Sequence, residues 1–321
     1  MKIIKQINFK ENYEVNLRSF LNNKISDIHH EIILFGKKKG NQNFAIFENT
    51  NLLGIFPFHF EKNHEKCLQA TYFNLSLPGP IFNENLELKK FKKILRLSLD
   101  EIENKCLLNK VKTVKINFSD LINFETGSQK YFTLLEVLSD YNYVNKSFVG
   151  LRLNLHRNYE EILSFFSKGH KSEIKRQSKL SYLFESSEDN IVRYEDFKIM
   201  LKNQVDYDEY FEPLYEMYLQ NKIFLVFSSD RKIFFSLFSI AGETVEYFVS
   251  KLDSTNDHSL IANSIKYFKL NKKLKYLNLG IINYLENSSL RNSNKKKNIS
   301  TFKKGFGGDK YLLSIFEKKY F

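Results

Sequence analysis

Segments with alternating apolar residues and segments with helical spacing follow one another along this chain, and this alternation constrains its fold most. Residues 43–60 contain two strand-like runs that turn near Thr50 and Asn51. Residues 85–105 carry the apolar side chains Leu88, Phe91, Ile94, Leu95, Leu97 and Leu99 and are expected to form a helix. The pattern predicts a mixed α/β chain rather than a helical bundle or a β-sandwich.

The same kinds of element are expected in both halves, with a domain boundary near His156 that gives domains 1–155 and 156–321. The first half predicts further strands at 71–77, 111–118 and 143–155, a turn at Leu77-Pro78-Gly79-Pro80 and a helix at 131–139. The second half predicts a helix from Asn158 through Phe166, a break at Gly169 and a basic helix over 170–180. Beyond it we expect a helix at 194–219 around Pro213, strands at 223–227, 233–240 and 245–252, a helix capped by Asp257 or Ser259, a strand at 274–279 and a last strand at 311–316.

The length of 321 residues suits two domains of ordinary size. No apolar run approaches the roughly 20 residues that span a bilayer, and the start of the chain shows no signal peptide. Cys67 and Cys106 lie in no metal or redox spacing and are expected to be ordinary core thiols in a reducing compartment. These features predict a cytoplasmic protein.

The net charge of +12 is weak evidence for an anionic partner, because only 8 of the 49 basic residues are Arg and the composition is typical of an AT-rich genome. Its distribution is more informative than its sum. Lys168 to Leu180 holds five basic residues and one acidic residue, whereas Arg291 to Lys304 holds six basic residues and no acidic one.

Several classes of site are absent from the sequence. It contains no phosphate-binding P-loop, no dinucleotide-binding glycine motif, no HExxH, no CxxC and no nucleophile elbow. His29, His30 and Glu31 are expected on an exposed loop or helix face, and residues 206–209 at a solvated helix start. We therefore predict no metal site.

The basic segment after Ser167 is the first positive signal. Lys171, Lys175 and Lys179 have the spacing i, i+4, i+8, which places them along one helix face. Three neighbouring ammonium groups repel one another unless they are solvated or face an anion. The sequence leaves open whether this is a solvated face or a phosphate-binding groove.

The second positive signal is Phe302-Lys303-Lys304-Gly305-Phe306-Gly307-Gly308. Three glycines in four residues permit backbone conformations with positive φ and a close approach to another group. We expect the aromatic residues to anchor this loop in a core while the lysines point outward. A glycine-rich hairpin entering the last strand would explain the motif structurally.

Together, these signals resemble the Fem-type transferases (FemA, FemB and FemX) and their relatives with a GNAT-like, BioF2-like acetyltransferase domain. The resemblance is carried by FSKGHKSEIKRQSKL, by the run VEYFVSKLD, SLIANSIKYFKL and KYLNLG, and by the terminal FKKGFGG. It covers residues 145–321 best, while the first half agrees only in the order of its elements. Two departures from the family are Asn278, where many relatives have Asp, and a basic segment richer in Lys than in Arg, which removes bidentate phosphate recognition.

The resemblance implies an α/β (α+β) fold of tandem GNAT-like acyltransferase domains, each a mixed bent sheet flanked by helices. It implies transfer of an aminoacyl or acyl group onto an amine of a cell-envelope precursor, either a peptide or an amino-sugar. In the Fem group the donor is aminoacyl-tRNA and the acceptor is a peptidoglycan precursor. We therefore expect an anionic or lipid-linked acceptor, tRNA as a candidate donor, no bound cofactor, no DNA, and at most peripheral membrane contact.

Acyl transfer needs a deprotonated amine near an activated carbonyl and a donor for the developing oxyanion. Lys303 is the best candidate for that donor or for a contact to a donor phosphate. Glu246 and Tyr247 are candidate general bases, and proton loss to water is the alternative. The predicted substrate-binding residues are Lys171, Lys175, Arg176, Lys179, Asn278, Lys304, Gly305, Phe306, Gly307 and Gly308, with the basic helix and the glycine-rich loop bordering one cleft.

Two alternatives remain at this stage. An acyl-CoA enzyme would cradle pyrophosphate in a glycine-rich turn that opens a helix. Residues 253–258 contain no glycine and two carboxylates, and residues 77–80 lose two N–H donors to proline, so an aminoacyl-tRNA-like donor is favoured. Outside enzymes, the basic windows are compatible with a nucleic-acid-binding module or with a non-catalytic GNAT-like interaction protein.

Overall fold

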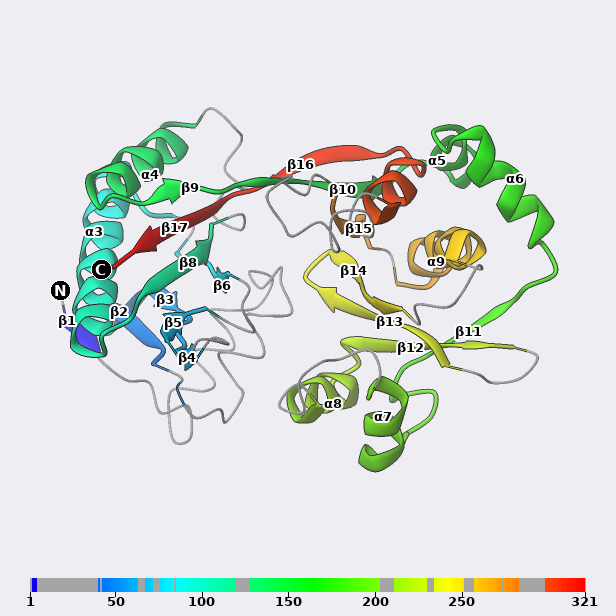
Figure 1. Cartoon of the computed structure of the whole chain (residues 1–321), viewed down its shortest axis with the longest axis horizontal. Helices are drawn as coiled ribbons and strands as arrows, with labels where there is room; N and C mark the ends of the chain where they lie inside the picture. The colour runs from blue at the N-terminus through cyan, green and yellow to red at the C-terminus, as the bar shows by residue number, and fades with distance from the viewer. Residues whose placement is uncertain are drawn as a thin grey trace. The chain divides into compact units, whose positions relative to one another are not determined.

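The computed structural model of the chain divides into two compact units (Figure 1). Unit 1 comprises Met1–Phe148 and Leu312–Phe321, and unit 2 comprises Val149–Tyr311. The first crossing thus lies seven residues before the boundary proposed from the sequence, and the C-terminal segment returns to unit 1. The structure describes residues 2–4, 40, 42–62, 67–71, 76–83, 85–118, 128–202, 211–229, 234–250, 257–272, 274–282 and 298–320.

The described residues of unit 1 form two sheets. The first is antiparallel and has the order β1 (Lys2–Ile4), β2 (Phe44–Glu48), β3 (Asn51–Phe56) and β7 (Ile81–Phe82). The second has the order β4 (Glu61–Lys62), β5 (Leu68–Ala70), β8 (Thr113–Asn117), β17 (Ile315–Lys319) and β9 (Val144–Asn145), and β6 (Leu77–Pro78) also pairs with β8. The strand pair predicted within residues 43–60 is confirmed as β2 and β3.

Two predicted helices of unit 1 are confirmed as α3 (Leu88–Leu108) and α4 (Gln129–Asp140). The apolar stripe of α3 is buried because it faces the strands, and it includes Phe91, Ile94, Leu95, Leu99, Ile102 and Cys106. Cys106 is buried and Cys67 half-buried, and neither forms a disulfide bond. No helix in the described residues combines the length and the apolar composition that crossing a membrane requires.

The strand predicted at 71–77 is described only in part: Leu77 belongs to a strand, whereas Thr71 and Ser76 do not. Residues 72–75 lie outside the described residues, and Leu77–Pro78 forms β6, which runs parallel to β8 at Ile116 and Asn117. Pro78 was predicted to lie in a turn, but it occupies the end of this strand. Proline has no N–H to extend the ladder, and a Cβ on Gly79 would lie 2.3 Å from the Asn117 carbonyl oxygen. The chain therefore breaks between β6 and β7.

Unit 2 is built on one seven-stranded sheet. Its order is β11 (Tyr182–Glu185), β12 (Ile223–Ser228), β13 (Phe234–Ala241), β14 (Thr244–Ser250), β15 (Tyr276–Ile281), β10 (Phe148–Asn154) and β16 (Asp309–Leu313). The parallel strands β14 and β15 are joined by α9 (Asp257–Asn271). β12 has buried residues on both faces, as its continuous apolar run predicts, whereas β11 was not predicted from the sequence.

The remaining helices of unit 2 correct three predictions. α5 (Tyr159–Ser164) ends before Phe165, and α6 (Lys168–Arg176) begins after the cap Ser167, whose side chain accepts the His170 N–H. Gly169 therefore lies inside α6 rather than between two helices, and Lys179 lies beyond its end. The helix predicted over 194–219 is divided into α7 (Tyr194–Leu201) and α8 (Phe211–Leu219), with Pro213 in the first turn of α8, where its missing N–H costs nothing.

Two segments that were each predicted as one strand form two strands in the structure. Residues 143–155 form β9 and β10, and the segment around 311–316 forms β16 and β17. β9 pairs with β17 in one sheet, while β10 and β16 are neighbours in the other. The alternation of side chains cannot show that a strand changes sheets, because the local periodicity is the same on both sides of the change.

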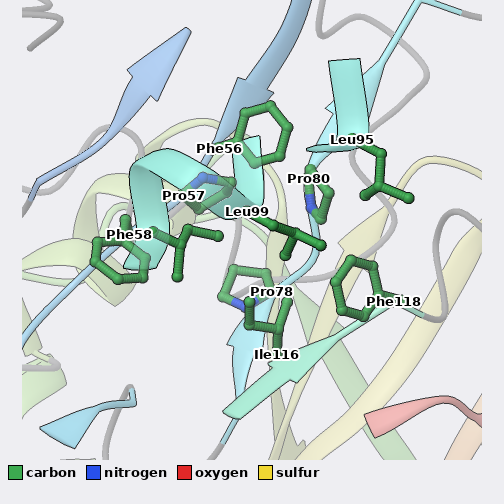
Figure 2. Close-up of a pocket in the computed structure, with 10 residues that line it drawn as sticks. Phe56, Pro57, Phe58, Pro78, Pro80, Leu95, Leu99, Ile116 and Phe118 are labelled. Carbon is green, nitrogen blue, oxygen red and sulfur yellow. The ribbon is translucent and has the colours of Figure 1, made fainter. Parts of the chain in front are cut away.

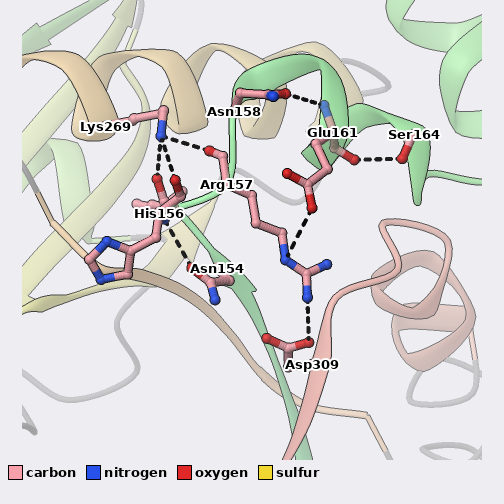
Figure 3. Close-up of polar contacts among 9 residues, drawn as sticks. Asn154, His156, Arg157, Asn158, Glu161, Ser164, Lys269 and Asp309 are labelled. Carbon is pink, nitrogen blue, oxygen red and sulfur yellow. Dashed lines mark hydrogen bonds and ion pairs between the residues drawn. The ribbon is translucent and has the colours of Figure 1, made fainter.

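The turn from β10 into α5 is tied to α9 by one lysine (Figure 3). Lys269 donates from Nζ to the carbonyl oxygens of Leu155 and Arg157 at 2.6 Å each, and more weakly to that of His156 at 3.4 Å. Asn158 then caps α5 by accepting the N–H of Glu161 at 2.7 Å, as the sequence predicted. These contacts fix the start of α5 on the core of unit 2.

Candidate active site

The parallel strands β14 and β15 stop pairing with each other before either strand ends. Their register runs from Thr244 opposite Tyr276 to Glu246 opposite Asn278. Beyond this point β14 continues in its pairing with β13, and β15 continues in its pairing with β10. In open sheets, ligands bind outside the carboxyl ends of parallel strands where neighbouring strands separate. The residues around Glu246 and Asn278 are therefore the place to look for chemistry.

A hydrogen-bonded polar network marks this position. Asn278 Nδ2 donates to Glu246 Oε1 at 2.8 Å, and Asn278 Oδ1 accepts the Gly280 N–H at 2.8 Å. The Tyr311 hydroxyl of β16 donates to the same Oδ1 at 2.6 Å. Glu246 and Asn278, both predicted site residues, are thus in direct contact, and Tyr311 joins them.

Lys303 lies beside the end of β15. It belongs to a short helix over 298–304, and its Nζ donates to the carbonyl oxygen of Ile281 at 3.3 Å. No carboxylate in the described part of the chain lies within ion-pair distance of Nζ, and burial lowers the pKa of Lys303 to about 8. The expectation that both lysines of the motif point outward is therefore wrong for Lys303, whereas Lys304 is exposed.

The glycines of the motif follow a helix and do not form the hairpin that the sequence suggested. Gly307 and Gly308 have φ values of +66° and +91°, which lie in the left-handed region. A Cβ would lie 2.6 Å from the Phe165 carbonyl oxygen at Gly307, and 2.7 Å from the Arg152 carbonyl oxygen at Gly308. Glycine is required at both positions for backbone conformation and for space.

The glycine-rich loop contacts the start of α6. Gly305 O accepts the Ser167 N–H at 2.7 Å, and His170 Nε2 lies 2.8 Å from the Phe302 carbonyl oxygen. A Cβ on Gly305 would lie 2.1 Å from His170 Cε1, so this contact also requires glycine. Phe306 is fully buried against Phe166 and His170, which confirms that the aromatic residues anchor the loop.

The basic side chains of α6 take no part in the contact between the glycine-rich loop and the start of α6. Lys171 donates to the Ser164 carbonyl oxygen at 2.8 Å, and Arg176 pairs with Glu173 on its own helix. Lys175 and Lys179 are exposed. The structure therefore joins the two predicted motifs through their backbone and through His170. A cleft lined by the α6 lysines stays a prediction.

Two histidines at the starts of α6 and α9 were not singled out from the sequence. The rings of His170 and His258 meet edge to face with centroids 4.4 Å apart, and Phe302 packs 4.9 Å from His258. Burial lowers the pKa of both, and the neighbouring His170 lowers that of His258 further. His170 stands inside the basic motif, and this was the only signal that could have found the pair.

Tyr311 and Arg152 were also missed. The Arg152 guanidinium lies 4.2 Å from the ring centre of Tyr276 and 5.7 Å from that of Tyr311. Nothing in the local sequence distinguishes these residues from ordinary strand positions. By contrast, the Tyr247 ring packs 5.2 Å from that of Phe238, beside the apolar core of unit 2.

The described residues contain no group of three or more His, Cys, Asp or Glu side chains placed to hold a metal ion. The two segments weighed as metal candidates from the sequence, residues 29–31 and 206–209, lie outside the described residues. The lysine run 295–297 and the turn residues 253–256 lie outside them as well.

Unit 1 has a pocket of a different character (Figure 2). It lies between α3 and the ends of β3, β6 and β8, and its lining side chains are all apolar. They are Phe56, Pro57, Phe58, Pro78, Pro80, Leu95, Leu99, Ile102, Ile116 and Phe118. Such a lining offers neither a proton donor nor a charge for group transfer.

Comparison with known proteins identifies the fold. No protein-family model matches the sequence, and no curated protein matches it in sequence. In structure, the chain is similar to FemX (TM-score 0.60, 13% identity, covering 100% of this chain and 98% of that one). It is also similar to L-PGS from Bacillus licheniformis (TM-score 0.57, 12% identity, 98% and 94%) and to the C-terminal domain of a putative lysylphosphatidylglycerol synthetase from Agrobacterium fabrum (TM-score 0.57, 11% identity, 97% and 93%).

These likenesses span the whole chain and not only its second half. The predicted resemblance to the Fem and GNAT-like fold is confirmed, and the chain has the mixed α/β architecture that this resemblance implied. At identities of 11–13% they show the fold alone.

Proposed function

We propose that this protein is a transferase that moves an aminoacyl or acyl group onto an amine of a cell-envelope precursor, and that unit 2 carries the chemistry. The observation that carries the proposal is the Lys303 ammonium, which is partly buried, has no carboxylate partner in the described residues and lies beside the end of β15. The fold shared with FemX and L-PGS supports the reaction class. The acceptor is proposed as a peptide or amino-sugar by analogy with the Fem group.

In the proposed reaction the acceptor amine attacks the activated carbonyl of the donor. A C–N bond forms, the bond from the carbonyl carbon to the leaving oxygen breaks, and the amine loses one proton. Lys303 donates a hydrogen bond to the oxyanion that develops in between, which accounts for roughly 3–4 kcal/mol of barrier lowering. Glu246 or Tyr247 takes the proton directly or through water.

The proposed donor is aminoacyl-tRNA rather than acyl-CoA, and the start of α9 supports this choice. Gln177 Oε1 accepts the Ser259 N–H at 3.2 Å, and the Ser259 hydroxyl donates to the Gln177 carbonyl oxygen at 3.4 Å. His258 is covered by His170 and Phe302. A pyrophosphate cradle needs free N–H groups in the first turn of such a helix, and one of them is already used.

The exposed basic residues of unit 2 suit a large anionic donor. Lys175 and Lys179 are exposed on and after α6, where they can meet phosphates as separate point charges, and the exposed Arg176 between them is paired with Glu173. Binding of tRNA should weaken steeply with salt, by about 0.7–0.9 in the log–log slope for each phosphate neutralised.

The direct test uses purified protein, tRNA charged with radiolabelled amino acids, and soluble and lipid-linked envelope precursors. We expect label to move onto a precursor with the wild-type protein and with Lys310→Met, which removes an exposed lysine of β16. Transfer should fall by about 10²–10³ in Lys303→Met. Full activity of Lys303→Met would refute the role of this lysine, and saturable micromolar coenzyme A binding without salt-sensitive tRNA binding would reverse the choice of donor.

A further inference from the structure

An irregularity in β15 leaves room for the Lys303 ammonium. The pairing of β10 with β15 shifts by one residue between Leu151 and Arg152, and opposite this shift Gly280 has a φ of +77°. A Cβ built on Gly280 would lie 3.2 Å from Lys303 Nζ. The bulge therefore leaves the space that the ammonium occupies, and it turns the Ile281 carbonyl towards that ammonium.

The side chain of Asn278 holds the bulge in place. Its Oδ1 accepts the N–H of Gly280 two residues later, which closes a side-chain turn around the irregular position. Its Nδ2 donates to Glu246 across the parallel strand pair. Because an amide has one acceptor end and one donor end, these two contacts also fix which way the amide points.

Tyr311 completes this arrangement from β16. Its hydroxyl is the second donor to Asn278 Oδ1, at 2.6 Å. The Tyr311 ring packs against the backbone at Gly150, where an added Cβ would lie 2.4 Å from Tyr311 Cζ. The Arg152 guanidinium lies 5.7 Å from the centre of the same ring and also stacks on Tyr276. Tyr311 and Gly280 are thus both hydrogen-bonded to Asn278, and the next residue, Ile281, accepts the hydrogen bond of Lys303.

We infer that Tyr311 and Asn278 are positioning residues for Lys303, and that Asn stands at 278 because its amide must face the Glu246 carboxylate. An aspartate at this position would bring two carboxylates to hydrogen-bonding distance. It would also add a negative charge two residues from Gly280, beside which Lys303 Nζ lies, and so favour the charged ammonium. The departure from the family pattern at 278 is thereby explained within this chain.

The placement is testable without any substrate; only its consequence for transfer rests on the proposed function. Reductive methylation with formaldehyde and cyanoborohydride, followed across pH by mass spectrometry of the peptide that carries Lys303, gives the titration midpoint of this amine. Tyr311→Phe removes one hydroxyl and keeps the ring. We expect it to loosen the bulge, to admit water to Lys303 and to raise the midpoint by about one pH unit, which is about a tenfold change in the neutral fraction at pH 7.

Tyr276→Phe is the matched control. Tyr276 stacks on the same Arg152 guanidinium, and its hydroxyl makes no hydrogen bond within the described part of the chain. The same substitution there should leave the Lys303 midpoint unchanged. Superimposable labelling curves for Tyr311→Phe and Tyr276→Phe would overturn the inference.

A second variant keeps the test valid if Tyr311→Phe folds poorly. Asn278→Asp combined with Glu246→Gln exchanges the acid and the amide across the strand pair, so every hydrogen bond of the network can form again. We expect the stability lost in Asn278→Asp alone to return while the Lys303 midpoint stays raised, because the charge has moved to 278. A midpoint equal to that of the wild type would contradict the inference.

Transfer assays separate this inference from the proposed function. If Tyr311→Phe raises the Lys303 midpoint and lowers kcat with little change in KM, both are supported. If the midpoint moves while Lys303→Met transfers normally, the positioning stands and the proposed function fails. If Lys303→Met is inactive and the midpoint does not move in Tyr311→Phe, the proposed function stands and the positioning fails.

Discussion

Units 1 and 2 share part of their strand pairing, but the side chains in their interiors differ. In unit 2, β11, β12, β13 and β14 are successive antiparallel neighbours, α9 crosses over, and β15 returns parallel to β14. In unit 1, β1, β2, β3 and β7 are likewise successive antiparallel neighbours, and after α3 the strand β8 lies parallel to β5 and β6 in a second sheet. An antiparallel strand then flanks the returning strand in each unit, β10 in one and β17 in the other.

The difference lies where the parallel strands part. In unit 2 this position holds Glu246, Asn278 and Tyr311, with Lys303 beside them. In unit 1, Pro78 and Pro80 break the corresponding strand, and the space beside it is lined by apolar side chains only (Figure 2). The comparison teaches that this framework does not by itself specify chemistry, which depends on the side chains placed at the parting of the strands.

The largest expected effect is that of Lys303→Met. Transfer should fall by about 10²–10³, because the donor to the oxyanion is lost. Stability at neutral pH should not fall, since the substitution removes a partly buried charge that has no carboxylate partner among the described residues. Steady-state transfer and thermal unfolding of the same preparation check this. A variant that is both inactive and unfolded would not support a catalytic role.

The converse substitution is Leu99→Ala in unit 1. Leu99 is 1% exposed and lines the apolar pocket, so truncation should cost about 2–5 kcal/mol of stability. Transfer per folded molecule should stay within about twofold of the wild type. Denaturant unfolding together with activity below the transition measures both. A loss of transfer as large as that of Lys303→Met would break the comparison, because unit 1 would then take part in the chemistry.

The pH dependence sharpens the assignment to unit 2. With the pKa of Lys303 lowered to about 8, the ammonium is lost above this pH, and the rate should fall about tenfold per further pH unit. Deprotonation of Lys303 should lower the rate but raise the free energy of unfolding. The unfolded chain binds this proton more tightly, so the contribution of Lys303 to stability rises between pH 8 and about 10.5. Lys303→Met should lack the stability increase, which pH-dependent unfolding would reveal.

The smallest effects compare two helix caps. Ser128 accepts the Tyr131 N–H at the start of α4, and Ser167 accepts the His170 N–H at the start of α6. Replacing either by Ala should cost about 1 kcal/mol. Only Ser167→Ala should also change transfer, because Ser167 Oγ lies 3.0 Å from His170 Nδ1 beside the glycine-rich loop. Equal transfer by both variants would separate this loop from the site.

Most elements could be predicted because their signals are local. The apolar stripe of α3, the alternation in β2 and β3 and the cap at Asn158 each depend on residues within one or two turns of chain. The errors arose where tertiary structure decides. β9 and β10 belong to different sheets, and Pro78 ends a strand because β8 happens to lie beside it.

The candidate site divides in the same way. The FKKGFGG motif and the basic segment were visible because Gly and Lys have conformational and electrostatic properties that are independent of their partners. Tyr311, Arg152 and the pair His170 and His258 were not visible, since their roles come from contacts across 33 to more than 130 residues of chain.

By itself, the sequence predicted the fold class and the resemblance to the Fem-type transferases, and it singled out Lys303 as a candidate site residue. Only the tertiary structure decided that Lys303 is partly buried while Lys304 is exposed, although the two residues are adjacent. Successive residues of a helix point about 100° apart, so the surroundings determine which of them meets the sheet. The pKa of Lys303, and with it the proposed chemistry, depends on that placement because burial acts on the charge through the solvent it removes.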